Sequence, residues 1–582
     1  MSLLVKQAIA ELRTAIMDAA GRAVADGEFP AVPLSDFNVE VPANRDFGDY
    51  SANAAMAWAR DLHCAPRKIA QALIDRMELC DTFFERCEVA GAGFLNFYLR
   101  SSFNACIIQD ILEKGDSYGR SDYGRGKKIN VEFVSANPTG PMHMGNARGG
   151  ALGDCLAAVL DFAGYDVSRE FYVNDAGNQI AKFGLSLDIR YQQLFLGEDA
   201  VQLPEDSYHG EDIIERAKEF AAVNGDKYMS ASEQERRQAL IDFALPKNIA
   251  AMKENMAKYR INYDTWFLES TLHNDGELEE TLNIMRDKGL TYEKDGALWY
   301  KNKEVLAAKL REQGKSEEEI ERLELKDEVL IRTNGNPTYF AADIAYHRNK
   351  FIERGFDRVI DVWGADHHGH AIRFAATMRA PALGLEGRKL DFLIMQMVRL
   401  MRGDEIVKVS KRTGKALSLA DLMDEIGVDA CRFFFNAKPD SHLEFDLDLA
   451  IRQDSENPVY YVQYAHARIC SILKKMESEG VQFAGAEQVD ATLLTEPSEM
   501  DLIRMLAAFP QEIVMAAEKY DPSRINRFVI DLASAFHRFY GNCRIQGADP
   551  ALQQARLALC IGVKNAIFNV LTMFKINVPE KM

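Results

Sequence analysis

The segment from residue 131 to residue 146 constrains the fold of this chain more than any other stretch. It begins with the run Val131-Glu132-Phe133-Val134, which has the composition of a buried strand. A turn with two prolines and a glycine follows at 138–141, and a His-x-Gly-Asn sequence at 143–146 opens a helical pattern. This order places a histidine and the free N–H groups of a helix N-terminus at one point, which is a favourable site for phosphate.

Strand and helix patterns alternate from about residue 127 to residue 440. Strands are predicted at 128–135, 169–173 and 358–363, with helices after the first turn and at 178–196. The order strand, helix, strand predicts a Rossmann-like, doubly wound parallel sheet of the α/β class. Two charged stretches, about 197–258 and 301–326, interrupt the pattern, and we expect both to be helical insertions that face solvent.

The segments on either side of this region have different patterns, so three domains are predicted. Residues 1–115 combine a helical repeat with the strand-like run 94–99 and indicate an α+β domain. Residues 116–445 would hold the parallel sheet. Residues 446–582 are helical in pattern throughout, with Pro510, Pro522 and Pro550 expected to separate the helices of an all-α bundle.

Bulk properties narrow the class of protein. There is no continuous run of about 20 apolar residues, so no membrane span is expected. The chain's 9 cysteines occur singly, which favours reduced thiols and a cytoplasmic location. The net charge of −19 argues against a nucleic-acid partner, but basic residues cluster at 127–128, 399–412 and 474–475, and binding depends on such local fields.

A second basic segment, Lys408-Val409-Ser410-Lys411-Arg412, has the composition of a phosphate clamp, and Gly414 would allow it to move. Taken alone, it is more simply read as an exposed basic turn. Together with the first signature, it indicates a nucleotide site.

Three carboxylates lie where a strand or an aromatic cluster would bury them. Glu132 lies inside an apolar strand, Glu269 follows the aromatic cluster 263–267, and Asp343 follows Tyr339 by one helical turn. A buried carboxylate requires a partner. A cationic substrate would provide one, and a planar guanidinium would bind in bidentate fashion. For each residue individually, an internal ion pair is an equally good interpretation.

The segment from Trp363 to His370 contains three histidines and Asp366, which could ligate zinc. Its place after a predicted strand puts it instead at the carboxyl edge of the sheet, where α/β proteins bind ligands. We therefore expect a substrate or ATP contact there and no protein-bound structural metal.

These residues resemble known motifs. His143 to Asn146 and Lys408 to Arg412 are similar to the paired HIGH and KMSKS signatures of class I aminoacyl-tRNA synthetases. Nearly the whole chain resembles the arginyl-tRNA synthetase family of bacterial type. The motifs that carry this resemblance are 47–50, 93–97, 132–146, 174–179, 339–347, 363–369, 429–432 and 460–468.

The resemblance implies an enzyme that activates L-arginine with ATP and Mg²⁺ to arginyl-adenylate and transfers it to the terminal adenosine of tRNA(Arg). In this family, arginine activation usually needs bound tRNA. The N-terminal domain would contact the tRNA elbow and the C-terminal bundle the anticodon. A monomer is the default expectation. Tyr460, Tyr461 and Tyr464 in the bundle could stack on unpaired bases or could belong to the core, and both interpretations stay open.

The resemblance also assigns residues. ATP binding would fall to Pro138, Gly140, His143, Gly145, Asn146, Lys408, Ser410 and Lys411, of which His143, Asn146, Lys408 and Lys411 would be catalytic. Arginine binding would fall to Glu132, Asn137, Glu269, Tyr339, Asp343, Asp366 and His367. Asn146 stands where the family usually has a second histidine, so it can donate a hydrogen bond but carries no charge.

Two other functions remain open from the sequence. A tRNA-binding paralogue without catalysis would not need His143, Lys408, Lys411 and Asp343. A class I synthetase for another amino acid would not need the Tyr339/Asp343 pair or the N-terminal domain.

Overall fold

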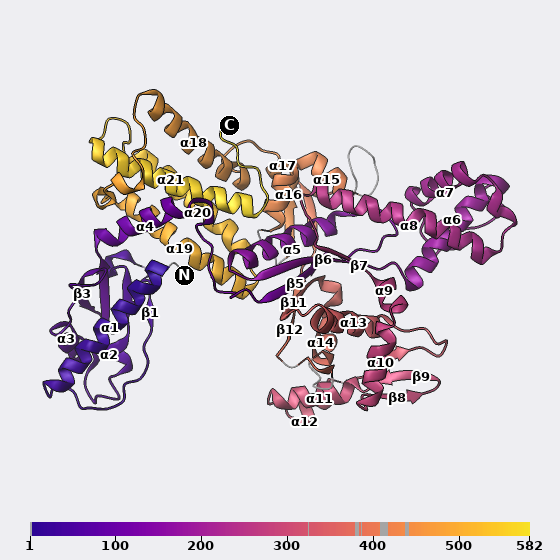
Figure 1. Cartoon of the computed structure of the whole chain (residues 1–582), viewed down its shortest axis with the longest axis horizontal. Helices are drawn as coiled ribbons and strands as arrows, with labels where there is room; N and C mark the ends of the chain where they lie inside the picture. The colour runs from indigo at the N-terminus through magenta and orange to yellow at the C-terminus, as the bar shows by residue number, and fades with distance from the viewer. Residues whose placement is uncertain are drawn as a thin grey trace.

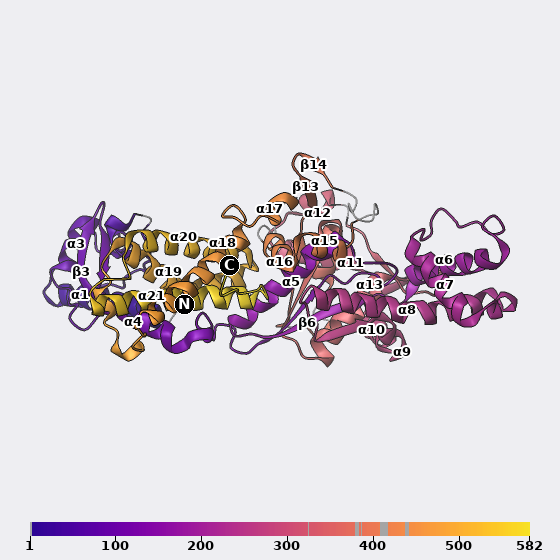
Figure 2. The ribbon, with the colours of Figure 1, turned by 90° about the horizontal axis from the view of Figure 1, so that it is seen from above.

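The computed structural model describes residues 3–42, 44–323, 325–378, 383–385, 387–407, 417–436 and 442–582. The molecule is elongated (Figures 1 and 2). The N-terminal domain lies at one end, the parallel sheet near the middle, and the helices α6, α7 and α8 at the other end. The C-terminal helices lie between the N-terminal domain and the sheet.

The central sheet has five parallel strands in the order β12-β11-β5-β6-β7. The predicted doubly wound α/β fold is therefore confirmed. The strands are β5 (Lys128–Phe133), β6 (Asp166–Val173), β7 (Thr265–Leu268), β11 (Arg358–Gly364) and β12 (Lys389–Met395).

The strand order reverses between β5 and β11. From β5 the chain passes through α5 (Met144–Phe162) to β6 on one side, whereas β11 pairs with the other side of β5. Ligands in such sheets bind beyond the carboxyl ends of the strands at this switch point. A Cβ on Gly153 would lie 2.2 Å from the Phe133 ring, so glycine lets α5 pack closely on β5.

The N-terminal domain packs helices on an antiparallel sheet of order β1-β2-β4-β3. Its elements are α1 (Leu3–Ala25), β1 (Val39–Glu40), β2 (Tyr50–Ala52), α2 (Ala54–Ala57), α3 (Pro66–Ile74), β3 (Phe84–Ala90) and β4 (Phe94–Leu99). The next helix, α4 (Ser101–Lys114), lies against the C-terminal bundle.

Both predicted insertions are helical. The first contains α7 (Glu211–Asn224) and α8 (Glu233–Lys258), which pack with α6 (Gly177–Leu196) around a separate apolar core. The second contains α11 (Asn302–Glu312) and α12 (Glu317–Arg322) beside a small antiparallel sheet. That sheet consists of β8 (Thr291–Lys294), β9 (Ala297–Tyr300) and β10 (Glu328–Ile331).

The remaining elements of the sheet-bearing region surround the carboxyl edge and lead to the bundle. They are α9 (Glu269–Asn274), α10 (Glu277–Asp287), α13 (Tyr339–Arg348), α14 (His368–Thr377), β13 (Val398–Arg402), β14 (Glu405–Ile406), α15 (Leu419–Ile426), α16 (Val428–Phe435), β15 (Leu443–Asp446) and α17 (Leu447–Ala450).

The C-terminal bundle consists of α18 (Pro458–Ser478), α19 (Pro497–Lys519), α20 (Ser523–Asn542) and α21 (Pro550–Met573). Helix α21 is long and apolar enough to span a membrane, but 72% of its apolar window is buried in the molecule. It forms part of the bundle's core.

Pro510 does not separate two helices as the sequence suggested, because it lies inside α19. A proline there leaves the carbonyl of Leu506, four residues earlier, without its helical N–H donor. The hydroxyl of Tyr118 replaces that donor and lies 2.8 Å from the Leu506 oxygen. This contact from the segment after α4 lets α19 continue through the proline.

A buried carboxylate joins the bundle to the sheet. Asp154 of α5 is fully buried and contacts Arg432 of α16 at 2.5 Å, Lys575 at 2.9 Å and Arg169 of β6 at 2.8 Å. Burial opposes the charge of Asp154, but these three cations outweigh it and lower its pKa to about 2. The carboxylate therefore stays ionised and holds the C-terminal segment against α5.

Candidate functional site

A cavity of about 990 Å³ opens at the switch point, beyond the carboxyl ends of β5 and β11. Its walls come from the turn after β5, from the segment that follows β6, and from α9, α13 and α14. Four residues of the first insertion also line it: Tyr208, Gly210, Asp212 and Ile213. The expectation that the 197–258 insertion only faces solvent is therefore wrong. The packing of α7 and α8 against α6 places the start of the insertion's helical part at the wall of the cavity.

The backbone is unusual where β5 ends. Val134 and Ser135 have φ angles of 73° and 41°, a conformation that L-residues other than glycine seldom adopt. The chain then reaches His143, the N-cap of α5. The side chain of Asn146 accepts from the His143 backbone N–H at 2.9 Å, and the two residues form a capping box. This capping role of Asn146 adds to the ATP contact that the resemblance implied for it.

The His143 ring has a defined hydrogen-bond pattern. Its Nδ1 accepts from the Gly145 N–H at 3.1 Å, which leaves Nε2 as the protonated nitrogen of the neutral ring. Partial burial lowers the pKa of His143 and favours this neutral form. A Cβ on Gly145 would lie 2.9 Å from the His143 ring, so the glycine is required by the histidine itself. His143 can thus donate one hydrogen bond toward the cavity.

The second signature, with Lys408, Ser410 and Lys411, lies outside the described residues. The chain after it is tied to the first signature. Ser418, the N-cap of α15, pairs with His143 in an isolated β-bridge, and the Leu419 N–H donates to the Met142 carbonyl at 2.9 Å. Residues 418–419, which follow the basic segment in sequence, thereby lie at the N-terminus of α5.

Glu269 begins α9 and is almost fully buried. Burial raises its pKa to about 7, with a further contribution from the nearby charge of Asp343, while the hydrogen bond from Tyr172 opposes the shift. In the orientation that satisfies its neighbours, the Asn174 amide also donates to Glu269 at 2.9 Å. The two donors named here, the Tyr172 hydroxyl and the Asn174 amide, are both neutral.

Asp343 lies on α13 one turn after Tyr339, and both face the cavity. The Asp343 carboxylate contacts His370 Nε2 of α14 at 2.8 Å. The other acidic residue of this wall, Glu269, has His273 at 3.9 Å. Among the described residues, no lysine or arginine forms an ion pair with either carboxylate. Within the part of the chain that the structure describes, the charged side chains in contact with these two acidic groups are thus the imidazoles of His370 and His273.

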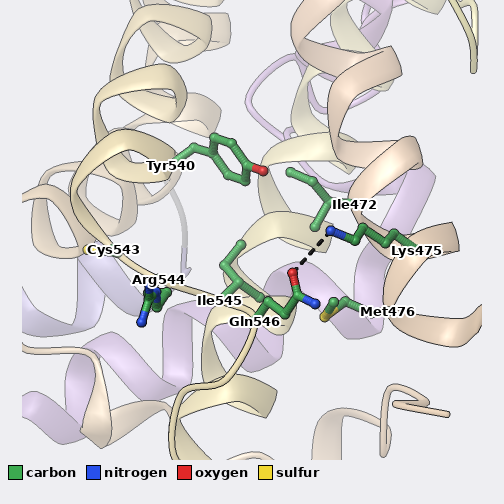
Figure 3. Close-up of a pocket in the computed structure, with 8 residues that line it drawn as sticks. All are labelled: Ile472, Lys475, Met476, Tyr540, Cys543, Arg544, Ile545 and Gln546. Carbon is green, nitrogen blue, oxygen red and sulfur yellow. Dashed lines mark hydrogen bonds between the residues drawn. The ribbon is translucent and has the colours of Figure 1, made fainter. Parts of the chain in front are cut away.

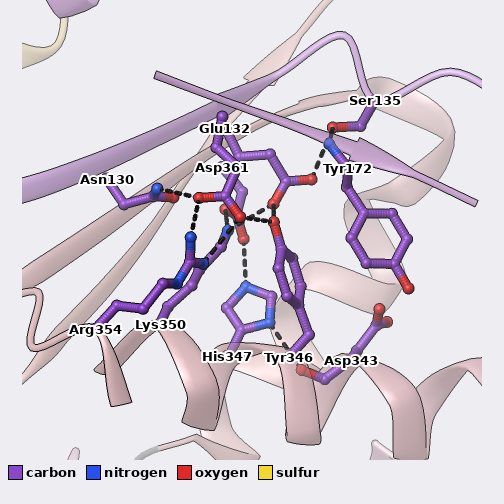
Figure 4. A network of polar contacts seen from close by, with 11 residues as sticks. Asn130, Glu132, Ser135, Tyr172, Asp343, Tyr346, His347, Lys350, Arg354 and Asp361 are labelled. Atoms are coloured by element: carbon purple, nitrogen blue, oxygen red, sulfur yellow. Dashed lines mark hydrogen bonds and ion pairs between the residues drawn. The ribbon is translucent and has the colours of Figure 1, made fainter. Parts of the chain in front are cut away.

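Glu132 has a different environment (Figure 4). Its carboxylate is buried and contacts Lys350 Nζ at 2.5 Å, while the hydroxyls of Ser135 and Tyr346 donate to it at 2.8 and 2.9 Å. The structure thus shows the internal ion pair, one of the two interpretations of the sequence. Glu132 also lines the cavity, and its contact with arginine stays a prediction. Ser135 also accepts from the Tyr172 N–H at 3.1 Å, which links this carboxylate to the strained end of β5.

Lys350 is the centre of this buried network and has no exposed surface. It also contacts Asp361 of β11 at 3.2 Å. Burial opposes its charge, but Asp361 and Glu132 outweigh that effect, so that the pKa of Lys350 is raised. Lys350 lies in the short π-helical turn Asn349–Glu353 that follows α13. This turn brings its side chain under the sheet edge.

The network also fixes the helix that carries Asp343. His347 contacts the Asp361 carboxylate at 2.7 Å and the backbone carbonyl of Asp343 at 2.8 Å. Arg354 binds both oxygens of Glu170 on β6, at 2.7 and 2.9 Å. Three strands of the sheet thus hold α13 through buried charges (Figure 4).

The structure brings most of the predicted site residues to this cavity. Those that line it are Glu132, Asn137, Gly140, His143, Asn146, Glu269, Tyr339, Asp343 and His367. Pro138 and Gly145 are not among the lining residues. The side chain of Asp366 lies outside the described part of the chain.

Several lining residues had no predicted role. They are Tyr172, Asn174, Gln179, Tyr208, Asp212 and His370. The run 174–179 was visible as a motif, and His370 as one of three histidines, but no local pattern indicated Tyr208 or Asp212. Within the described residues, no group of three or more His, Cys, Asp or Glu side chains is placed to hold a metal ion.

Comparison with known families agrees with this geometry. The model for "tRNA synthetases class I (R), catalytic domain" matches residues 107–448. The model for "Arginyl tRNA synthetase N terminal domain" matches 5–99, and that for "DALR anticodon binding domain" matches 462–582. The chain therefore has the catalytic domain of a class I aminoacyl-tRNA synthetase.

Comparison with individual relatives shows which family of class I synthetases the chain belongs to. An arginine–tRNA ligase of Caldanaerobacter subterraneus is 51% identical over 100% of both chains, and one of Ruminiclostridium cellulolyticum is 50% identical over 98% of both. The chain belongs to the arginyl-tRNA synthetase family. The Thermus thermophilus arginyl-tRNA synthetase structure, 22% identical, has the same fold, with a TM-score of 0.70 over 98% of this chain and 100% of that one.

Proposed function

We propose that the cavity at the switch point binds the guanidinium of L-arginine between Glu269 and Asp343. The observation that carries this assignment is that neither carboxylate has a lysine or arginine partner among the described residues, although Glu269 is buried. A guanidinium presents several N–H donors in a plane and suits two carboxylates better than an ammonium does. Tyr339 and His367, from the same walls, and Asn137, after β5, would contact the rest of the amino acid, as would Asp366.

The ATP half of the site is proposed to lie at the N-terminus of α5. His143 Nε2 would donate to a phosphate oxygen, and the Asn146 amide nitrogen, which its capping role leaves free to donate, would add a second contact. Pro138, Gly140 and Gly145 shape the turn that presents these donors. Lys408, Ser410 and Lys411 are proposed to close over the pyrophosphate, a role supported by the anchor of the following residues at His143. Magnesium would arrive bound to the phosphates.

The activity is that of an arginine–tRNA ligase. The arginine carboxylate attacks the α-phosphorus of ATP, and pyrophosphate leaves. The terminal 2′-hydroxyl of tRNA(Arg) then attacks the activated carbonyl, and AMP leaves. Since the substrates supply both nucleophiles, the protein contributes position and charge. A neutral His143 that already donates from Nε2 needs no proton transfer to stabilise the charge that develops on the phosphates.

The domain division 1–115, 116–445 and 446–582 is proposed to match three tRNA contacts, at the elbow, the acceptor end and the anticodon. A pocket of about 430 Å³ between α18 and the end of α20 supports the last contact (Figure 3). Lys475, Arg544 and Tyr540 line it, so it offers two cations and one ring to an unpaired base. A cytoplasmic monomer without a membrane contact completes the proposal.

Tyr460, Tyr461 and Tyr464 of α18 are half-buried. The rings of Tyr461 and Tyr464 lie against His537, at 5.1 and 5.9 Å between centroids. Both a packing role and a role in stacking on bases are compatible with this position, so the sequence-based alternatives remain predictions.

Pyrophosphate exchange tests the proposed function. With ATP, Mg²⁺ and bulk tRNA present, the purified chain should exchange pyrophosphate into ATP in response to arginine. Lysine and citrulline should be poorer by about 10⁴-fold in kcat/KM, because each leaves the pocket's carboxylates incompletely paired. Charging of tRNA with labelled arginine should follow the same order. A chain that binds tRNA but shows no arginine-dependent exchange would instead be a paralogue without catalysis.

Arginine binding should depend on pH through Glu269. With its pKa raised to about 7 by burial, the carboxyl group of Glu269 is half protonated near neutrality. The guanidinium favours the ionised form, so binding expels the proton. The Kd for arginine should therefore rise as the pH falls from 8 to 6, approaching about tenfold per unit below the pKa.

Calorimetry at pH 7 in two buffers with different ionisation enthalpies should show release of a fraction of a proton per arginine bound. Arginine should also raise the melting temperature more at pH 8 than at pH 6, since it relieves the cost of a buried, ionised Glu269. Glu269→Gln should bind arginine more weakly and lose this pH dependence. A Glu269→Gln variant with the wild-type pH profile would show that Glu269 is not the group responsible.

A further inference from the structure

The turn between β5 and α5 has little hydrogen bonding of its own. Residues 137–141 contain Pro138 and Pro141, which have no backbone N–H. In the described part of the chain, the one hydrogen bond to the backbone of residues 137–141 comes from Asn248, whose Nδ2 donates to the Pro138 carbonyl at 3.0 Å. Asn248 lies on α8, 110 residues away in sequence.

Asn248 is itself held by the first insertion. The Nε of Arg216 on α7 donates to Asn248 Oδ1 at 3.0 Å, which orients the amide so that Nδ2 faces the turn. Arg216 is fixed in turn by Glu219, with both carboxylate oxygens at 3.0 Å, and Lys247 contacts the same carboxylate at 2.7 Å. The contact with Pro138 is thus the last of a series of polar contacts that runs from Glu219 through Arg216 to Asn248.

A second contact joins the insertion to the same turn. The first turn of α7 places Asp212 against Gly140, and a Cβ on Gly140 would lie 3.5 Å from Asp212 Oδ2. Burial raises the pKa of Asp212, which agrees with a carboxyl group pressed into this wall. Both contacts come from one rigid element, because α6, α7 and α8 share an apolar core.

We infer that the helical insertion holds the 137–141 turn in the conformation that binds ATP, and that Asn248 is the positioning residue through which it does so. This inference rests on the proposed ATP half of the site. A displacement of reacting groups by about 1 Å can cost as much as 100-fold in rate, so a turn with one backbone hydrogen bond depends strongly on that bond.

Two substitutions of Asn248 distinguish the loss of its hydrogen bond to Pro138 from the loss of the whole side chain. Asn248→Asp keeps the shape and still accepts from Arg216, but it cannot donate to the Pro138 carbonyl. Asn248→Ala removes both contacts. We expect both variants to lower kcat/KM for ATP in pyrophosphate exchange by about tenfold, while the KM for arginine stays within about twofold of wild type. Arg216→Gln should give a smaller loss of the same kind.

The matched control is Asn255→Ala, which removes the same residue type from the same helix where the structure shows no side-chain hydrogen bond. It should leave both KM values unchanged. Direct titration of each variant with Mg-ATP in the absence of arginine gives a second readout, in which Kd for ATP should rise about tenfold for Asn248→Asp and Asn248→Ala.

The inference is overturned if Kd for ATP is unchanged in Asn248→Asp and Asn248→Ala, or if the KM values for ATP and arginine rise together. Should Asn248→Ala fail to fold, the isosteric aspartate variant decides. Wild-type chain that binds ATP without arginine-dependent exchange would contradict the proposed function, yet the ATP titration would still test the role of Asn248.

Discussion

Asp343→Asn should raise the Kd for arginine by about 100-fold or more while ATP binding is unchanged. The substitution keeps the size of the side chain and an oxygen that can accept from His370, but it removes the charge opposite the guanidinium. Loss of one partner from a desolvated charge pair costs about 2–5 kcal/mol. Calorimetric titrations with arginine and with Mg-ATP measure the two effects separately.

The ratio of arginine to citrulline gives the sharper form of this prediction. Citrulline has nearly the shape of arginine without its charge. The wild-type preference for arginine over citrulline therefore measures how much the carboxylates contribute to the binding of the guanidinium. In Asp343→Asn that preference should fall toward the level that Glu269 alone provides. Asp287→Asn, at the end of α10 and outside the cavity, is the control and should behave as wild type. An Asp343→Asn enzyme with normal arginine affinity would remove Asp343 from the pocket.

The sequence predicted those parts of the fold that are encoded locally. The order of β5, turn and α5 follows from an apolar run, two prolines and a capping sequence within 131–146. The same holds for α6 and for the strand β4. Period and turn residues suffice for such elements because the backbone hydrogen bonds close within a few residues or between neighbouring strands.

The roles of individual site residues depended on contacts that no local pattern contains. Glu132 had two interpretations in the sequence, and the deciding partner, Lys350, is 218 residues away. Lys350 reaches the sheet through a π-helical turn, which has no clear sequence signal. The first insertion has an ordinary charged helical pattern, so its return to the cavity through Tyr208 and Asp212 could not be read from composition.

The internal role of Glu132 changes how the pocket discriminates. Glu132, Asp361 and Glu170 are paired with Lys350 and Arg354, whereas no lysine or arginine of the described residues pairs with Glu269 or Asp343. The acidic groups near the sheet edge therefore divide into one set that fixes α13 and another that is available to a cation. The sequence shows only that acidic residues are present. Which acidic residues are paired internally depends on which carboxylates lie within reach of Lys350 in the π-helical turn.

Lys350→Met should destabilise the folded chain by about 3–5 kcal/mol, because it leaves Glu132 and Asp361 buried without their shared cation. Methionine has a similar length and fits an apolar interior, so the loss reports charge more than volume. The melting temperature of the sheet-bearing domain should fall by several degrees. The kcat/KM for arginine should fall as well, since the same network fixes Ser135 and the helix of Asp343.

The pH dependence of this loss distinguishes charge from packing. Burial raises the pKa of Glu132 even beside Lys350, whereas Lys350 and His347 keep the pKa of Asp361 low. Without Lys350, the folded-state pKa of Glu132 rises further and that of Asp361 rises as well, so stability is retained at low pH and lost as the pH increases through them. The difference in melting temperature between wild type and Lys350→Met should therefore be larger at pH 8 than at pH 5.5. The double variant Lys350→Met/Glu132→Gln should recover part of the loss, because it removes one of the two uncompensated charges.

Lys315→Met, which breaks the exposed pair with Glu319, should change stability by about 0.5 kcal/mol or less. A Lys350→Met variant with a deficit that is the same at both pH values would show that packing, and not charge, is what Lys350 contributes.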